Sequence, residues 1–435
     1  MDWWLILMLI LGSLVLLMVT GMPIAFCFML VNVAGVFLFF GGEAGLSQLT
    51  FSMRDSITSF AMLPLPLFIL MGEVMFHSGI AARMLGALDK WIGHLPGRLG
   101  LEAVAGGTVF ATLSGADMGA IAMLGSVLVP EMEKRGYKKP MSLGPVLGCG
   151  GLAIMIPPSG LAVLLGAIGQ ISVGKILVGI IIPGLLIAVL YASYIIIRCQ
   201  LQPSIAPAYT VPPTPLLDKL RALVRYILPL GLIIFLVIGV ILLGVATPTE
   251  AAATGALGTF ILAAVYRKLN WQVVKKSVAS TVNITVMMFM IVVGAIAFSQ
   301  ILAYTGASRG IAELAVGLSM APIFILIAMQ VVVLIMGMFM EVVSIMMITL
   351  PVFVPVIHTL GFDPVWFAVM FLLNVVMAVI SPPFGLDLFV MQGVAPADTT
   401  MGDIYKAGLP FLGCDLIVMV LIIAFPQLVL WLPIL

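Results

Sequence analysis

Serine hydroxyls next to glycine and paired prolines are the residues in this apolar chain most able to bind an ion. Ser114 and Gly115 stand at the tip of one apolar segment, and Pro157, Pro158 and Ser159 interrupt the next. Proline removes a backbone N–H, so a helix broken inside a bilayer exposes carbonyl oxygens next to the serine hydroxyl. Sodium is bound by oxygens of this kind, where helix C-termini add negative potential. The pattern predicts a cation site; the alternative is a proline kink that only shapes packing.

The same pattern recurs further along the chain. An ungapped shift of 225 residues pairs Pro130 with Pro355, Gly136 with Gly361, Pro157 and Pro158 with Pro382 and Pro383, and Gly160 with Gly385. The same shift also pairs identical residues at Val127, Val129, Leu147, Ala153 and Leu161. We interpret this as an internal repeat with a second cation site. Its predicted ligands are Gly337, Met338, Glu341, Ser344, Ser381, Pro382 and Pro383.

Composition indicates that both sites lie in a membrane. The 435 residues are 63% hydrophobic and 9% charged, with a mean hydropathy of +1.29. We therefore expect an all-α polytopic membrane protein. The net charge of +1 argues against nucleic acid as a partner. The spacing of the four cysteines fits neither a disulfide framework nor a metal site, so we expect buried or interfacial thiols. The four are Cys27, Cys149, Cys199 and Cys414. We expect no cofactor other than the coupling ions.

Apolar runs of about 20 residues locate the spans. We expect full spans over 3–20, 22–41, 61–77, 174–198, 223–245, 247–266, 279–303 and 408–433. Re-entrant hairpins are expected over 100–134 and 321–358, and Pro-Pro-broken helices over 141–171 and 364–392. Segments 80–98 and 307–319 mix charged and apolar residues, which predicts amphipathic helices in the interface.

These elements divide the chain into five parts. The division is scaffold helices over 1–60, a first inverted repeat over 61–198, a linker over 199–222, scaffold helices over 223–278, and a second inverted repeat with the last span over 279–435. The first repeat holds the arm helix, the tip at 114 and the break at 157–159. The second holds the tip at 337–344 and the break at 381–383.

Charge predicts how these elements cross the bilayer. If the basic turn at 134–139 is cytoplasmic, sixteen of the nineteen lysines and arginines lie inside, and only Arg54, Lys175 and Arg309 lie outside. Five spans separate the two hairpins, and because five is odd the hairpins must enter from opposite faces. Both termini then lie outside. Inverted repeats with helices broken at the midplane are a known plan for secondary transport.

Several motifs resemble a known family. They are the run from Ser114 to Tyr137, Ile-Pro-Pro-Ser at 156–159, Gly-Val-Ala-Thr-Pro-Thr-Glu-Ala-Ala at 244–252, Gly-Met-Phe-Met-Glu at 337–341, Leu-Gly-Phe-Asp-Pro-Val at 360–365, and Ser-Pro-Pro-Phe-Gly-Leu-Asp-Leu-Phe-Val at 381–390. Together they resemble the large membrane subunit of TRAP (tripartite ATP-independent periplasmic) transporters, within the ion transporter superfamily. The resemblance covers nearly the whole chain.

This resemblance implies a function and partners. The chain is expected to be the permease of a sodium-coupled, elevator-type system of the bacterial inner membrane, with its termini in the periplasm. It would import a small organic anion, a carboxylate or a sulfonate. The implied partners are a small four-helix membrane subunit, a periplasmic substrate-binding protein and the lipid bilayer.

Three positions depart from the family pattern. Ala116, followed by Asp117, stands where the family usually has a second serine, Glu341 where it has aspartate, and Asp387 where it has asparagine. The extra carboxylates predict weak substrate contacts at Asp117 and Asp387, together with Ser159. A carboxylate inside a span costs about 2.5–3.5 kcal/mol, so Glu341 needs a partner. Either it binds sodium or a proton, or it reaches water at the hairpin mouth.

Other polar residues have simpler explanations. Glu250 follows Thr247 at a predicted helix start, which indicates a capping carboxylate. Glu73 and Asp415 lie within spans and are expected to contact another helix or the small subunit. The histidines are expected to be interfacial because they lie at predicted span ends. They are His77, His94 and His358.

Other functions would need features of their own. A stand-alone sodium/carboxylate symporter of the same superfamily would need no binding protein, and co-purification with a small subunit distinguishes the two systems. An intramembrane enzyme would need a nucleophile with its base or a metal motif, and neither Gly-x-Ser-x-Gly nor His-Glu-x-x-His occurs. We therefore expect no enzyme activity. A channel is disfavoured because broken helices with one site per repeat suit alternating access.

Overall fold

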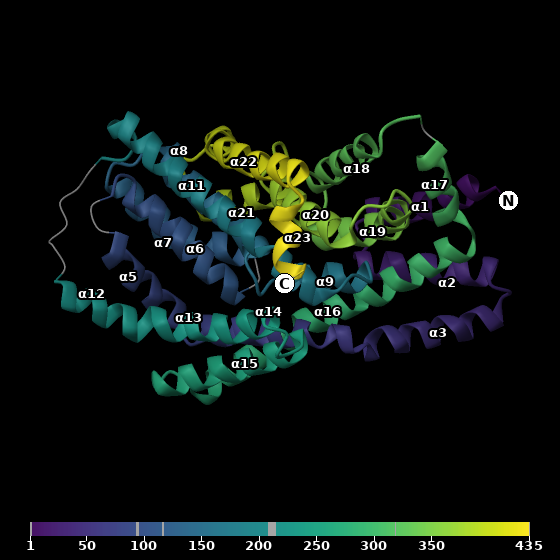
Figure 1. The fold of residues 1–435 in the computed structure, drawn as a ribbon, viewed down its shortest axis with the longest axis horizontal. Coiled ribbons are helices and arrows are strands. Elements are labelled where there is room, and N and C mark those ends of the chain that lie inside the picture. Colours follow the sequence, from purple (N-terminus) through teal and green to yellow (C-terminus); the bar gives the residue numbers. More distant parts are fainter. Residues whose placement is uncertain (1, 93–94, 115–116, 208–214, 318, 435) are drawn as a thin grey trace.

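The computed structural model describes residues 2–92, 95–114, 117–207, 215–317 and 319–434. Every regular element within these ranges is a helix, so the all-α prediction is confirmed (Figure 1). Up to the end of the first repeat they are α1 Trp3–Val19, α2 Ile24–Phe39, α3 Glu43–Thr58, η1 Phe60–Met62, α4 Pro64–His77, α5 Ile80–Ile92, α6 Arg98–Ser114, α7 Asp117–Lys134, α8 Lys139–Met155, α9 Gly160–Ile168, α10 Val173–Gly179 and α11 Ile181–Leu201.

The described elements in the second part of the chain are also helices. Its helices are η2 Pro203–Ile205, α12 Leu216–Ala222, η3 Leu223–Ile227, α13 Leu228–Ile234, η4 Phe235–Gly239, α14 Val240–Leu242, α15 Pro248–Val265, α16 Trp271–Tyr304, α17 Ala307–Gly317, α18 Pro322–Gly337, α19 Val342–Thr359, α20 Pro364–Val379, α21 Leu386–Val394, α22 Met401–Ala424 and α23 Gln427–Ile434.

The 225-residue repeat is confirmed as a repeat of helices. Adding 225 to the bounds of α7 gives 342–359, which are the bounds of α19. The same shift carries α5, α6, α8 and α9 onto α17, α18, α20 and α21 to within two residues at each end. The hairpin α6–α7 lies in the left half of Figure 1 and α18–α19 in the right half, so the two hairpins lie toward opposite ends of the long axis.

The two broken helices form the centre of the packed core. All residues from Met141 to Met155 of α8 and from Val365 to Val379 of α20 are buried. A Cβ added to Gly151 of α8 would overlap the side chain of Val376 in α20. Small residues let helices approach closely in a membrane, where lipid gives no hydrophobic drive for association. The glycine-rich sequence of α8 therefore permits the crossing.

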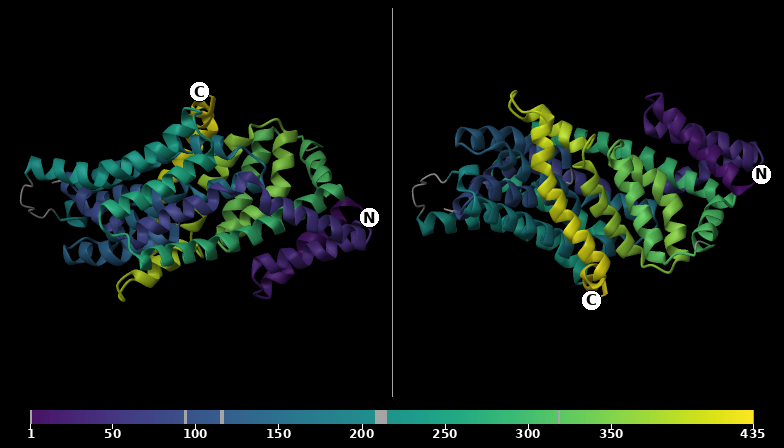
Figure 2. Two further views of the ribbon diagram at one scale, coloured as in Figure 1. Left: turned by 90° about the horizontal axis from the view of Figure 1, so that it is seen from below. Right: turned by 90° about the horizontal axis from the view of Figure 1, so that it is seen from above.

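Four elements differ from the sequence-based expectation. α3 was not predicted, because its polar residues lower its hydropathy below that of a span. α16 begins at Trp271 and not at 279, and α12 falls inside the expected linker. The last span divides into α22 and α23, which cross the middle of the molecule in the right-hand view of Figure 2. By length and apolar composition, seven described helices could cross a membrane, or eight if α8 and α9 count as one bent span.

Candidate functional site

The first break separates α8 from α9, and the chain bends by 46° between these two helices. Pro157, Pro158 and Ser159 are buried there, and the Pro157–Pro158 bond is cis. The Ser159 hydroxyl caps α9 by accepting a hydrogen bond from the Ala162 amide at 3.3 Å. Ser159 therefore lies at the predicted site, with one of its oxygen lone pairs already used by the helix.

The second break separates α20 from α21, and its Pro382–Pro383 bond is also cis. The buried Ser381 hydroxyl donates a hydrogen bond of 2.7 Å to the Met377 carbonyl, which leaves the lone pairs of the hydroxyl oxygen as acceptors. Gly385 closes the turn, because an added Cβ there would overlap the Val379 carbonyl. The break is a tight, fixed turn that contains one buried hydroxyl.

The second hairpin tip lies against the end of α20, next to the second break. A Cβ on Gly337 would overlap Ala378, three residues before Ser381. The Phe339 and Phe384 rings lie 5.5 Å apart between their centroids. Glu341 is the N-cap of α19, where its Oε2 accepts hydrogen bonds from the Val343 amide at 3.0 Å and the Ser344 amide at 3.4 Å.

This cap explains how Glu341 is accommodated. Its carboxylate lies at the positive end of the α19 dipole and is half-buried, and the buried Ser344 hydroxyl lies 3.4 Å from the same oxygen. The polar partner expected for the Glu341 carboxylate is thus supplied by the backbone amides at the start of α19. Met338 is half-buried at the end of α18. Glu341 and Ser344 thus belong to the tip that packs, through Gly337, against α20 just before the break at Ser381.

The first tip is less fully described. Gly115 lies outside the described residues, as does Ala116, and the side chains of Ser114 and Asp117 are likewise not described. The backbone ends α6 at Ser114 and begins α7 at Asp117, which agrees with a hairpin tip at this point. The predicted contacts of this tip with the first break stay predictions.

The half-helix of each repeat packs against the hairpin of the other repeat. Half-helix α21 of the second repeat packs against α7 of the first hairpin, and half-helix α9 of the first packs against α19 of the second. The fully buried Asp387, in the first turn of α21, faces α8 of the opposite repeat, because a Cβ on Gly150 would lie 3.1 Å from its Oδ2. The two breaks, the second tip and Asp387 are thereby joined in one core built from both repeats.

Two polar side chains on the helices around the second break are not among the residues predicted from the sequence. Tyr405 of α22 donates a hydrogen bond to the Pro383 carbonyl at 2.7 Å. Asn374 of α20 donates to the backbone carbonyl and the side-chain oxygen of Gln330 in α18, both in the buried interior. The signal for the second pair was available, since polar residues inside apolar spans mark interhelical contacts. Nothing in the sequence pairs Tyr405 with Pro383.

The remaining polar residues have structural partners. Thr247 and Glu250 form a capping box at α15, which confirms that prediction. Asp415 accepts a hydrogen bond from the Tyr191 hydroxyl of α11 at 2.7 Å, which confirms its contact with another helix. The Glu73 carboxylate instead lies 3.2 Å from His77 on its own helix. His94 is outside the described residues, His358 lies in the last turn of α19, and all four cysteines are buried.

Cavities that contain some polar side chains lie along the boundary between the scaffold helices and the half-helix α9. One has a volume of about 600 Å³ and lies between α3, α15, α16 and the connection after α9. A second, of about 320 Å³, lies between that connection and α19. Both are lined by Gln170 and Gln300. Within the described residues, no group of three or more histidine, cysteine or acidic side chains could hold a metal ion.

This fold, with opposed hairpins and two broken helices around one core, is that of a multi-pass membrane transporter. The family model described as "Tripartite ATP-independent periplasmic transporter, DctM component" matches residues 11–428 of this chain. The chain therefore belongs to the DctM family of TRAP transporter large permease subunits, and it is not an enzyme.

Two relatives agree with this assignment, and a solved structure shares the fold. The C4-dicarboxylate TRAP transporter large permease protein DctM of Rhodobacter capsulatus is 31% identical over 98% of both chains. The sialic acid TRAP transporter large permease protein SiaM of Vibrio cholerae is 30% identical over 96% of both. The crystal structure of the Alcanivorax borkumensis YdaH transporter superposes with a TM-score of 0.61 and 18% identity, covering 88% of this chain and 89% of that one, which supports the fold alone.

Proposed function

We propose that this permease couples the inward movement of a small organic anion to sodium ions that bind at the two helix breaks. The observation that carries the proposal is the meeting of the second tip and the second break. Glu341, Ser344 and Ser381 would supply side-chain oxygens to the sodium ion, and the broken backbone would supply carbonyls. The first tip and break, with Ser114, Gly115, Pro157, Pro158 and Ser159, would form the corresponding first site.

The anion would bind between the two breaks. Ser159 and Asp387 lie in the core shared by the repeats, and Asp117 begins the helix that follows the first tip. The relatives named for C4-dicarboxylates and for sialic acid support a carboxylate substrate, and a sulfonate is the second class to test. The transport would follow an elevator mechanism, in which the unit carrying both breaks moves against the scaffold helices.

We further propose that the anion is delivered by a periplasmic binding protein and that a small membrane subunit completes the system in the bacterial inner membrane. The family description names a tripartite, periplasmic system, which favours this arrangement over a stand-alone symporter. A permease that transports alone in proteoliposomes would favour the stand-alone symporter instead.

The test is uptake by proteoliposomes that contain the permease with its small subunit and binding protein. Succinate, sialic acid and a small sulfonate are supplied with and without a sodium gradient. Two sodium ions carry two charges, each worth about 2.3 kcal/mol per 100 mV. Uptake should therefore rise more steeply than first order in sodium, increase with an inside-negative potential, and need more sodium in Ser114→Ala. Unchanged uptake without sodium overturns the proposal.

A further inference from the structure

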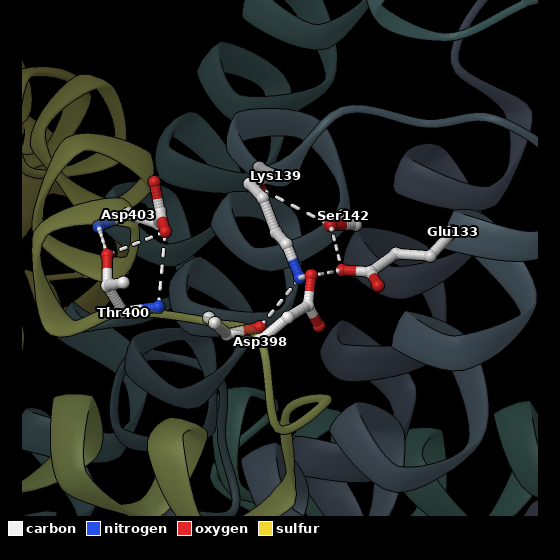
Figure 3. Close-up of polar contacts among 7 residues, drawn as sticks. Glu133, Lys139, Ser142, Asp398, Thr400 and Asp403 are labelled. Atoms are coloured by element: carbon white, nitrogen blue, oxygen red, sulfur yellow. Dashed lines mark hydrogen bonds and ion pairs between the residues drawn. The ribbon is translucent and has the colours of Figure 1, made fainter.

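The ammonium group of Lys139 joins three segments of the chain. Its Nζ lies 2.9 Å from Glu133 Oε1 and 3.1 Å from Asp398 Oδ2 (Figure 3). The same Nζ donates a hydrogen bond to Thr399 Oγ1 at 2.8 Å. An ammonium has three N–H donors, and three acceptors surround this one. Glu133 lies in the last turn of α7, Lys139 begins α8, and the other two acceptors lie in the connection between α21 and α22.

The three acceptors differ in their exposure to solvent. Thr399 is 8% exposed and the Glu133 side chain 21%, whereas the Asp398 side chain is 72% exposed. Solvent and salt screen an exposed pair much more than a buried one. Glu133 and Thr399 should therefore hold Lys139 more strongly than Asp398 does. Ser142, whose hydroxyl lies 3.5 Å from Glu133 Oε1, helps to fix that carboxylate (Figure 3).

The connection held by Lys139 sets the position of half-helix α21. At its far end, Thr400 and Asp403 form the capping box of α22, with 2.6 Å between Thr400 Oγ1 and Asp403 Oδ2. At its near end, Val394 packs so closely on α7 that a Cβ on Gly125 would lie 2.7 Å from its Cγ2. Lys139 is therefore anchored next to the contact between α7 and α21, which we call the α7–α21 seam.

The repeat contains an equivalent seam that is built differently. A shift of 225 residues relates the α7–α21 seam to the contact between α19 and α9, the α9–α19 seam. Under this shift Lys139 corresponds to Pro364, Glu133 to His358 and Ala395 to Gln170. Proline has no charge to bridge the seam. The cavity of about 320 Å³ lies there instead, lined by Gln170, Pro355 and His358.

We propose that Lys139 is a positioning residue that closes the α7–α21 seam, so that α21 and the first hairpin move as one body. The equivalent α9–α19 seam has proline in place of this cation and is hollow. This difference keeps the α7–α21 seam rigid and allows the packing at the α9–α19 seam to change. Lys139 acts through α21, which carries Asp387 against α8, and therefore affects transport without contacting the transported solute.

The seam can be tested without any transport assay. Val394→Cys places a thiol in the α7–α21 seam, and the four native cysteines are buried, so background labelling should be low. Adding Lys139→Met should raise the rate at which a maleimide labels the introduced thiol in membrane vesicles about tenfold, in the range expected for groups coupled in one ion-pair network. Lys138→Met is the matched control, because this neighbouring lysine carries the same charge and is exposed. It should leave the rate unchanged.

Graded variants keep the proposal testable if Lys139→Met does not fold. Glu133→Gln should raise the labelling rate more than Asp398→Asn, because the Glu133 side chain is more buried than that of Asp398. Lys139→Arg should restore the wild-type rate, because arginine keeps the charge and the hydrogen-bond donors. Uptake by the complete system should fall in the same order. The proposal is overturned if the introduced thiol labels at one rate in all variants, or if Lys138→Met has the same effect as Lys139→Met.

Discussion

Tyr405 donates a hydrogen bond of 2.7 Å to the carbonyl oxygen of Pro383, so a side chain of α22 holds the second helix break. Breaking a membrane helix at Pro-Pro frees carbonyls that lipid cannot satisfy, and neighbouring helices must supply donors. Tyr405 supplies one of them. The phenol also fixes the break in place relative to the last long span.

We expect Tyr405→Phe to weaken transport without preventing folding. A hydrogen bond between membrane helices contributes about 0.6 kcal/mol on average and about 1.7 kcal/mol at most. The loss should therefore lower initial uptake rates several-fold while the thermal midpoint in detergent shifts little. Tyr304→Phe is the control, since it removes a hydroxyl from an exposed ring that stacks on Phe40. Equal effects of both variants would contradict a specific role for Tyr405.

Glu341→Ala should raise the sodium concentration required for half-maximal uptake. It removes an oxygen from the proposed second sodium site together with a helix cap worth about 1 kcal/mol. Asp363→Ala separates these effects, because Asp363 caps α20 through the Val365 and Trp366 amides at 2.8 and 3.1 Å. That control should reduce stability while the sodium dependence stays unchanged.

Glu341→Gln separates sodium ligation from proton exchange. It keeps an oxygen acceptor and loses the ability to carry a proton. A partial sodium defect in initial uptake rates supports ligation. Complete loss of uptake with an altered pH profile supports proton coupling instead.

The crossing of α8 and α20 should be intolerant of added volume. Gly151→Ala places a methyl group where Val376 already lies, which costs about 1–3 kcal/mol in a well-packed core. A lower thermal midpoint should result, and Val376→Ala should restore part of it. Gly231→Ala is the matched control, because an added Cβ there meets nothing within 4 Å. Equal loss in both glycine variants would contradict the close crossing.

Cysteine labelling tests the orientation of the hairpins in the membrane. The exposed residues Lys138 and Thr359 lie at the outer ends of the first and second hairpins. The positive-inside rule predicts that Lys138→Cys reacts with an impermeant maleimide only from the cytoplasm, and Thr359→Cys only from the periplasm. Buried native cysteines keep the background low. Labelling of both from one side is incompatible with opposed hairpins in the membrane.

Much of this protein can be predicted from local sequence. Apolar run length identifies most spans, because a bilayer core about 30 Å thick demands it. The Pro-Pro pairs locate both helix breaks, and the 225-residue shift relates the bounds of α7 to those of α19. The Thr247–Glu250 capping box is equally local. Helix α3 was missed because its polar residues make it unlike a span when hydropathy is averaged.

The tertiary structure alone decided which parts of the repeats meet. A linear pattern places Ser381 near its own hairpin but gives no sign that α21 packs on the hairpin of the other repeat. Lys139 reads as one of four cations in a basic turn, yet it reaches Glu133, Asp398 and Thr399 together. Glu341 reads as a buried charge that needs a partner, and it finds one in the amides of its own helix. These outcomes depend on contacts between residues distant in sequence and on backbone direction at helix ends, which periodicity and composition do not encode.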